Sequence, residues 1–358
     1  MKRTINNLKR RPESRKVFIT YAIVTVLFII LEIMVSTKTI SSTMRGMLVP
    51  ICAYMVMAIS LNLVVGVLGE LSLGHGGFMS VGAFAGVATA IILQNVVPFA
   101  PLRLAISIVT AAIIAAAAGF VIGIPVLRLK GDYLAIVTLA FGEIIKSLFN
   151  NFYLGIDSHG LHCSMLTDKT GLAEGGRMII NGAMGIGGIK KIATFPAAYI
   201  LVMVALVIAF RLIYSRYGRA FQAIRDDRIA AESVGIDITK YKMICFVWSA
   251  ALAGAAGCLF AMNYSTIVAN KFDFNTSILV LVFVVLGGQG NMLGGITAAA
   301  ILTILPEKLR QFSEYRMLIY AILLIVLMVG SNNPTMHDKL SRLHLRLPGK
   351  KEGTGNGN

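Results

Sequence analysis

Long apolar runs separated by short polar segments dominate this chain. Ten runs occupy residues 17–35, 47–68, 79–93, 104–127, 133–152, 195–214, 244–262, 278–286, 296–305 and 317–329. A helix needs about 20 apolar residues to cross a hydrocarbon core of about 30 Å, and glycine-rich or amphipathic turns extend the shorter runs. The pattern predicts an all-α polytopic membrane protein with about ten transmembrane helices.

The composition agrees with a membrane protein. Of the 358 residues, 56% are hydrophobic and only 14% are charged, with a mean hydropathy of +0.77. A soluble domain carries about 25% charged residues. The net charge of +16 suggests nucleic acid in a soluble protein, but here the basic residues flank the apolar runs. We therefore expect contact with anionic lipid, and no nucleic acid.

The basic residues also predict an orientation, because loops rich in Lys and Arg stay in the cytoplasm. They concentrate in residues 1–16, 211–243 and the tail after 331. We expect a basic cytoplasmic tail (1–16), a transmembrane domain (17–332) and a disordered cytoplasmic tail (333–358). Within the domain, loop 215–243 is expected inside and loop 153–194 outside. The first run is longer than a signal peptide's apolar region and lacks an A-x-A site, so it is expected to remain as a span.

The four cysteines predict no disulfide framework and no metal site. Cys52, Cys245 and Cys258 fall within apolar runs, and Cys163 stands alone in the expected outer loop. No metal-ligand spacing accompanies them.

Two glycine-rich stretches interrupt the apolar pattern. Residues 73–82 (LGHGGFMSVG) and 286–295 (LGGQGNMLGG) both fit L-G-x-x-G-x-M-x-x-G. Paired interruptions in two halves of a chain favour an internally repeated transporter with broken helices near the pathway. The alternative is that small residues only let helices pack closely. The candidates are Gly74, His75, Gly77, Gly82, Gly287, Gly290 and Gly295. His75 alone is interpreted as a hydrogen-bonded structural residue rather than a proton carrier.

Glu143 and Lys146 lie within the fifth run, three residues apart and so on one helix face. Charges are expensive in hydrocarbon, and both are expected to face the bundle interior. They form either a polar step in a pathway or a neutralised pair that locks two helices. No second acidic residue lies deep in a run to complete a proton relay.

Residues 215–242 form the longest internal polar stretch on the expected inner side. Helical spacing over 218–234 places Ala220, Ile224, Ala231 and Val234 on one side. Asp227 intrudes on that side, which favours two short helices, and Gly235 is placed as a C-terminal cap. A partly apolar helix between two spans indicates docking to another protein. The alternative, a helix lying on lipid, fits the mixed charge less well.

Three further stretches accompany this segment: LSLGHGGFMSVGA, LRLKGDYLAIVTLAFGEIIK (127–146) and WSAALAGAAGCLFA (248–261). Ala230, Ala231, Glu232 and Gly235 resemble the EAA loop of ABC importer permeases. Over about residues 46–330 the chain resembles the LivM-type permease of branched-chain amino acid ABC importers. The EAA pattern of other importers continues into an Ile/Leu-Pro pair, where this chain has IDITKYK without the proline.

This resemblance implies a permease subunit in the bacterial inner membrane that imports branched-chain or related hydrophobic amino acids. It implies a second homologous permease, two ABC ATPase subunits and an extracytoplasmic substrate-binding protein as partners. The segment then acts as the coupling helix in an ATPase cleft. The residues implied are Gly218, Ala220, Ile224, Asp227, Ala230, Ala231, Glu232 and Gly235.

Absent motifs argue in the same direction. The chain has no G-x-x-x-x-G-K-[ST], H-E-x-x-H or G-x-S-x-G. We therefore expect no enzyme activity and no cofactor in this chain, with ATP bound by the partner subunits. The rival hypotheses are a stand-alone secondary transporter or channel, which needs an ion site in the membrane, and a membrane-embedded enzyme. Related permeases for urea or small amides leave the substrate open.

Overall fold

The structure, a computed structural model, is mostly helical. It describes residues 12–309, except 38–40, 95, 130, 158–159 and 166–176, together with residues 318, 319, 321, 322 and 325. The chain divides into two compact units, Met1–Ile304 and Leu305–Asn358. The tail 333–358, most of the basic tail 1–16 and most of the tenth apolar run lie outside the described residues. Everything below concerns the first unit, apart from the last turn of α12, which belongs to the second.

The long helices follow the predicted runs, with some shifted ends. They are α2 (Pro12–Ser36), α3 (Ser42–Asn62), α4 (His75–Ile92), α5 (Ala100–Val126), α6 (Asp132–Asn150), α7 (Phe195–Ile213), α10 (Ile238–Ala261), α11 (Phe274–Gly287) and α12 (Met292–Lys308). A π-helix (Leu63–Leu68) prolongs α3. Among the described residues, seven helical stretches are long and apolar enough to cross a membrane: Val17–Ser36, Ser42–Leu68, His75–Ile92, Ala100–Val126, Phe195–Ile213, Ile238–Ala261 and Ala269–Gly287. The protein is therefore a multi-pass membrane protein, and the count of ten spans in two related halves stays a prediction.

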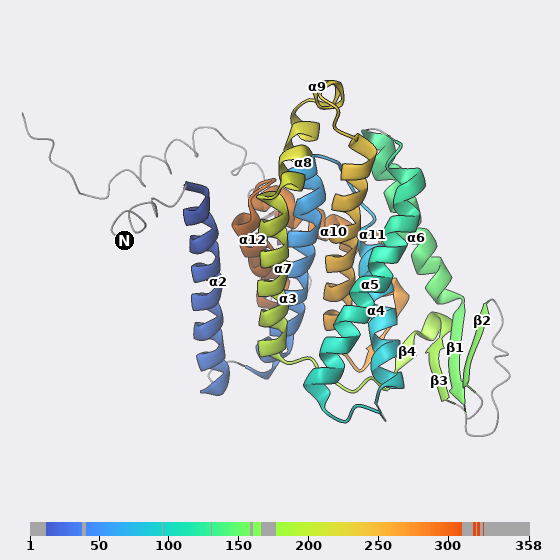
Figure 1. Cartoon of the computed structure of the whole chain (residues 1–358). Coiled ribbons are helices and arrows are strands. Elements are labelled where there is room, and N and C mark those ends of the chain that lie inside the picture. Colours follow the sequence, from blue (N-terminus) through green and yellow to red (C-terminus); the bar gives the residue numbers. More distant parts are fainter. Residues whose placement is uncertain are drawn as a thin grey trace, which may run out of the picture. The chain divides into compact units, whose positions relative to one another are not determined.

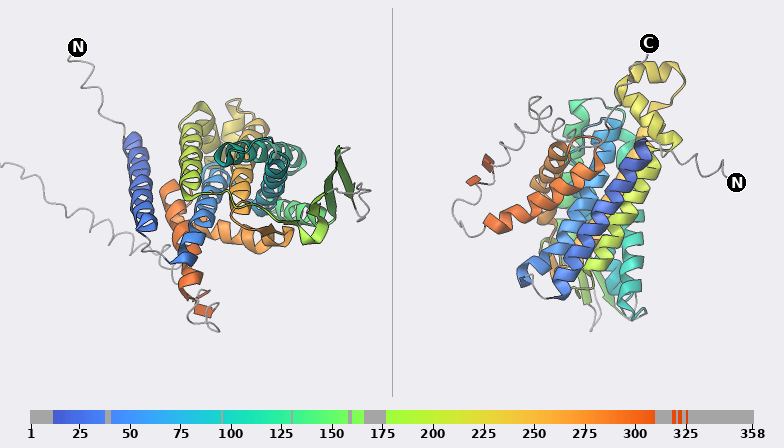
Figure 2. Two further views of the ribbon diagram at one scale, coloured as in Figure 1. Left: turned by 90° about the horizontal axis from the view of Figure 1, so that it is seen from below. Right: turned by 90° about the vertical axis from the view of Figure 1, so that its left-hand side faces the viewer.

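Helix α10 lies at the centre of the bundle, packed against α3, α4 and α5 (Figures 1 and 2). Small residues allow this close approach. A side chain on Gly82 of α4 would collide with the backbone of Gly254 in α10, and one on Gly257 would collide with Met79. Close packing of this kind is one of the forces that hold membrane helices together, beside interhelical hydrogen bonds, because lipid gives no hydrophobic drive between helices.

The expected outer loop contains strands, so the all-α prediction is wrong for this segment. Strands β1 (Phe152–Asp157), β2 (Gly160–Met165) and β3 (Arg177–Asn181) form an antiparallel sheet in the order β2-β1-β3. A second pair joins β4 (Ile186–Gly187) to β5 (Thr266–Ile267). The sheet lies beside α6, at the lower right of Figure 1. Glycine-rich segments can pair their backbones in short hairpins, which the apolar pattern does not reveal.

The polar stretch between α7 and α10 forms two short helices, as the position of Asp227 predicted. They are α8 (Arg216–Asp226) and α9 (Arg228–Ser233), and they lie at the opposite end from the sheet (Figure 1). The Ser215 hydroxyl caps α8 by accepting hydrogen bonds from the N–H groups of Tyr217 and Gly218. The Asp227 carboxylate caps α9 through the N–H groups of Ile229 and Ala230, at 2.8 and 3.1 Å.

Candidate pathway elements and cytoplasmic segment

The first glycine-rich stretch is a break between two helices. The π-helix ends at Leu68, residues 69–74 are not helical, and α4 starts at His75. We call residues 69–74 the first break. The backbone groups freed here find partners on neighbouring helices: the Leu73 N–H donates to Thr138 Oγ1 at 3.0 Å, and the Gly76 N–H donates to Ser277 Oγ at 3.0 Å. Non-helical backbone at membrane depth requires such partners.

His75 lies in a buried cluster of hydroxyl groups. Its Nδ1 is 3.2 Å from Ser72 Oγ and its Nε2 is 2.7 Å from Ser249 Oγ. Ser249 and Ser60 each donate to the other's backbone carbonyl at 2.7 Å. Because the Ser249 hydroxyl proton is used in that bond, His75 Nε2–H donates to Ser249 Oγ, and Nδ1 accepts from Ser72. All four residues of this Ser–His cluster are buried, which agrees with a structural role for His75.

The second glycine-rich stretch separates α11 from α12 at residues 288–291, the second break. Gly290 has a φ of +81°, which favours glycine. Its N–H donates to Asn62 Oδ1 at 2.8 Å. A side chain on Gly66 of the π-helix would collide with the Gly290 backbone. The second break is therefore held against the π-helix that leads into the first break, and sequence reasoning missed Asn62 because it stands in an apolar run.

The residues that match between the two glycine-rich stretches do not occupy equivalent positions in the structure. In the first, α4 starts one residue after Gly74; in the second, α12 starts at Met292, five residues after Gly287. Gly77, Gly82 and Gly287 sit at helix–helix contacts: a Cβ on Gly77 would lie 3.0 Å from the Gly142 Cα, and one on Gly287 would meet Gly294. Gly295 lies in the first turn of α12, where a Cβ would be 3.6 Å from Asn62 Nδ2. Close packing accounts for these glycines, and of the glycines matched between the two stretches only Gly74 and Gly290 belong to the breaks.

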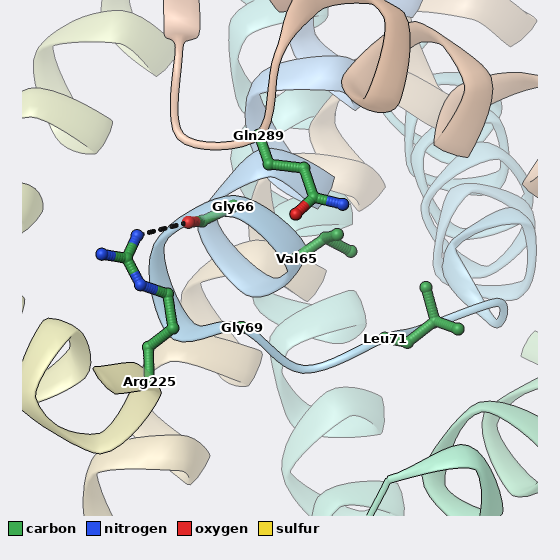
Figure 3. A pocket seen from close by; sticks show the side chains of 6 residues that line it. All are labelled: Val65, Gly66, Gly69, Leu71, Arg225 and Gln289. Carbon is green, nitrogen blue, oxygen red and sulfur yellow. Dashed lines mark hydrogen bonds between the residues drawn. The ribbon is translucent and has the colours of Figure 1, made fainter. Parts of the chain in front are cut away.

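An open pocket of about 460 Å³ lies where both breaks meet α8. Its walls are Val65, Gly66, Gly69, Leu71, Arg225 and Gln289 (Figure 3). Arg225 reaches from the last turn of α8 and donates from Nη1 to the Gly66 carbonyl at 3.1 Å. It also pairs with its neighbour Asp226 at 3.1 Å. The pocket thus connects the polar segment to both breaks.

A buried ion pair fixes the start of the first break. Lys242, in the second turn of α10, pairs with Glu70. The Lys242 side chain is 1% exposed and that of Glu70 is 16% exposed. In the sequence, Lys242 is only one of the basic residues of 211–243 that predict the orientation. The two residues stand 172 positions apart, and no local pattern joins them.

Glu143 and Lys146 pair with each other within α6, and their side chains are 40% and 24% exposed. Both side chains are thus half-buried, and the expectation that they face the bundle interior stays a prediction. Within the described residues the pair does not join two helices. The residues that α6 buries, Leu134, Ala135 and Thr138, all lie in its first two turns, away from the pair.

The polar segment turns its predicted apolar side toward the chain itself. Gly218, Ala220, Ile224 and Ala231 are buried, whereas Val234 is 76% exposed. Ala231 is therefore not free to enter a partner's cleft, contrary to the expected docking face. The exposed side carries Ile229, 81% exposed, with Ala230 and Glu232. Gly235 ends α9 with a φ of +84° and donates to the Glu232 carbonyl at 3.0 Å, which confirms it as the cap.

The chain resembles known transport proteins along most of its length. The family described as "Branched-chain amino acid transport system / permease component" matches residues 43–328. The high-affinity branched-chain amino acid transport system permease protein LivM of Salmonella typhimurium is 37% identical over 286 residues, covering 77% of this chain and 66% of the relative. LivM of Escherichia coli K12 gives the same identity and coverage. The permease protein LivH of Escherichia coli K12 is 27% identical over 293 residues, covering 77% of this chain and 89% of that protein. The chain spans just under two thirds of the length of the LivM relatives, and no solved structure matches it.

Proposed function

The chain belongs to the family of permease components of branched-chain amino acid transport systems, and from that membership we propose that it is the membrane-spanning subunit of an ABC importer. Its substrates are branched-chain or related hydrophobic amino acids. Its partners are a second, homologous permease, two ATPase subunits that bind ATP, and an extracytoplasmic binding protein. It lies in the bacterial inner membrane with both termini in the cytoplasm.

One observation carries the ATPase-driven mechanism: a pair of short helices protrudes at one end of the bundle and exposes large apolar side chains. Ile229 and Val234 are 81% and 76% exposed. Asp226, Asp227 and Glu232 are close to them in the sequence, so the segment mixes acidic with basic residues and suits an anionic lipid surface less well than a purely basic helix would. An exposed apolar pair among charged residues is typical of a site that enters a protein cleft. This supports docking of the ATPase on the α8–α9 segment.

The geometry suggests how ATP drives transport. The α8–α9 segment stands between the spans α7 and α10, so a force applied to it reaches both. A ligand shifts a conformational equilibrium only by binding one state better than the other. In this proposal the closed ATPase pair binds better to the outward-open arrangement of the permeases, which then receives substrate from the binding protein. ATP hydrolysis restores the inward-open arrangement.

The test pairs docking with transport. The chain is co-expressed with the proposed second permease, ATPase and binding protein, and the complex is reconstituted with ATP inside vesicles. We expect Ile229→Glu and Val234→Glu to reduce ATPase co-purification and uptake of labelled leucine together, because each buries a charge in an apolar cleft. Thr239→Glu, at an exposed position in the first turn of α10, is the control and should change neither. Normal association and uptake in both variants would exclude this surface, and a wild-type chain that retains no ATPase would refute the importer assignment.

A further inference from the structure

Two cationic side chains from different helices bind to the same short segment, residues 66–70. Arg225 of α8 bonds the carbonyl of Gly66, and Lys242 of α10 pairs with Glu70. We propose that Arg225 and Lys242 are positioning residues that transmit movement of the α8–α9 segment to both helix breaks, and so change the pocket between them. This inference rests on the proposed function, since the movement comes from an ATPase.

Arg225 connects the end of α8 to the π-helix. It stands in the last turn of α8, next to the Asp227 cap that starts α9, so it moves with the protruding segment. Its guanidinium donates to the backbone of Gly66, in a π-helix. π-Helical turns are rare and occur frequently at functional sites. The contact therefore attaches the segment to the π-helix that prolongs α3, directly before the first break.

Lys242 holds the other end of this piece. Its side chain is 1% exposed, and its ion pair with Glu70 lies just beyond Gly69. Breaking one member of a buried pair is strongly destabilising, because the remaining charge is left without a partner. If residues 66–70 move relative to α10, the Lys242–Glu70 pair must move with them or break. If they move away from α8, the hydrogen bond from Arg225 to the Gly66 carbonyl is lost.

The link continues into the second break. Gly66 lies directly against Gly290, and the Gly290 N–H is bonded to Asn62, just before the π-helix. A displacement of residues 66–70 therefore presses on the second break as well. Gly66, Gly69, Arg225 and Gln289 are all walls of the same pocket (Figure 3). Movement of the α8–α9 segment is therefore expected to change the opening of this pocket.

The first experiment needs no partner protein. Amide hydrogen exchange of residues 64–72 is measured in the purified full chain for wild type, Arg225→Met, Arg225→Lys and Arg219→Met. Arg219 is the control because it is exposed on the same helix and makes no side-chain hydrogen bond within the described part of the chain. We expect faster exchange in Arg225→Met, partial recovery in Arg225→Lys, and no change in Arg219→Met. Equal exchange in all four proteins would overturn the proposal, whatever the protein transports.

The second experiment measures uptake per ATP hydrolysed in the reconstituted complex. Coupling between two sites typically changes an equilibrium by about 5- to 150-fold. We expect Arg225→Met to assemble and hydrolyse ATP while its uptake per ATP falls by about that factor, and Arg225→Lys to recover part of it. If Arg225→Met took up as much substrate per ATP as Arg219→Met, the positioning role of Arg225 would be overturned. If Arg225→Met failed to assemble with the ATPase, Arg225 would be a docking residue instead. Absence of ATP-driven uptake in the wild type would refute the proposed function and leave the exchange result standing.

Lys242 is tested with its partner. Lys242→Met alone leaves Glu70 unpaired and is expected to unfold the region, so the informative variant is the double change Lys242→Met with Glu70→Met. An apolar pair of similar size often replaces a buried ion pair without loss of stability. We expect this variant to fold and hydrolyse ATP with uptake per ATP reduced about 5- to 150-fold. Normal uptake per ATP would show that the pair only stabilises the fold and would overturn its positioning role.

Discussion

Ser249 is the side chain on which three helices meet. From α10 it accepts a hydrogen bond from His75 of α4 and donates to the Ser60 carbonyl of α3. Ser80 of α4 offers the contrast: it is equally buried, and its hydroxyl has no hydrogen-bond partner within the described structure. The two serines separate the effect of a buried hydroxyl from the effect of its bonds.

Ser249→Ala is expected to destabilise the purified protein in detergent by about 1–3 kcal/mol, because it leaves polar groups of His75 and Ser60 without partners. A single interhelical hydrogen bond contributes about 0.6–1.7 kcal/mol in a membrane protein, so the lower half of that range is favoured. Ser80→Ala should be neutral or stabilising, since it removes an unsatisfied hydroxyl. The measurement is the thermal midpoint of unfolding, and equal shifts in the two variants would contradict this account.

Glu143 and Lys146 give a second prediction at this scale. They lie half-buried in the second half of α6, within the fifth apolar run. A single change to Ala leaves one charge unpaired there, whereas the double change leaves none. We expect each single variant to reach the membrane at a lower level than the double variant, measured by quantitative blotting of membrane fractions. A double variant that is inserted well but transports nothing would place the pair in the pathway.

Single residues were predictable from the sequence only where the signal was local. The interpretation of His75 as a hydrogen-bonded residue agrees with the Ser–His cluster. Ser60 and Ser249 were not found, because serines are common within apolar runs and their bond joins positions 189 apart. Glu70 and Lys242 were missed for the same reason, since a contact between distant turns leaves no periodic trace.

At the scale of elements, the α8–α9 corner depends on one carboxylate. Asp227 lies between the two helices and accepts from the N–H groups of Ile229 and Ala230. The cap ends one helix and starts the next, which fixes the direction in which the exposed Ile229 points. The neighbouring Asp226 pairs only with Arg225 among the described residues.

Asp227→Ala is expected to loosen α9 by about 0.5–2 kcal/mol, the usual effect of removing an N-cap. Asp226→Ala, one residue away and with the same change in charge, should leave α9 intact. Amide exchange of residues 229–234 measures this directly in the purified chain. If both variants exchange alike, the cap does not hold the corner, and docking through Ile229 loses its structural basis.

Elements were predictable where periodicity or a cap marked them. The two helices and the Gly235 cap followed from Asp227, Gly235 and the apolar spacing. The short strands did not, because their pairing is decided by backbone contacts such as that between Ile186 and Ile267 rather than by a pattern of side chains. The start of α4 at His75, four residues before the apolar run, was also missed, because its first turn is polar and glycine-rich.

The whole molecule is expected to present the sheet and the α8–α9 segment to opposite sides of the membrane. The seven candidate spans and the basic residues of the 211–243 region carry this expectation. After replacement of the four native cysteines, Met184→Cys should react with an impermeant thiol reagent added outside intact cells. Ile229→Cys should react only after the membrane is opened. Both positions are well exposed, at 73% and 81%, so the reverse pattern would invert the orientation.

The pairing of β4 with β5 turns the stretch from Ile186 to Ile267 into a closed loop whose two ends are stapled together. A further bond, from the Ile189 N–H to the Ser265 carbonyl at 3.0 Å, reinforces the staple. The α8–α9 segment lies at the other end of this loop, one helix length from the β4–β5 pair. For the 19 residues of α7 that length is roughly 28 Å, at about 1.5 Å per residue. We expect the paired end to act as a hinge, so that a force applied at Ile229 would tilt α7 and α10 about Ile186 and Ile267.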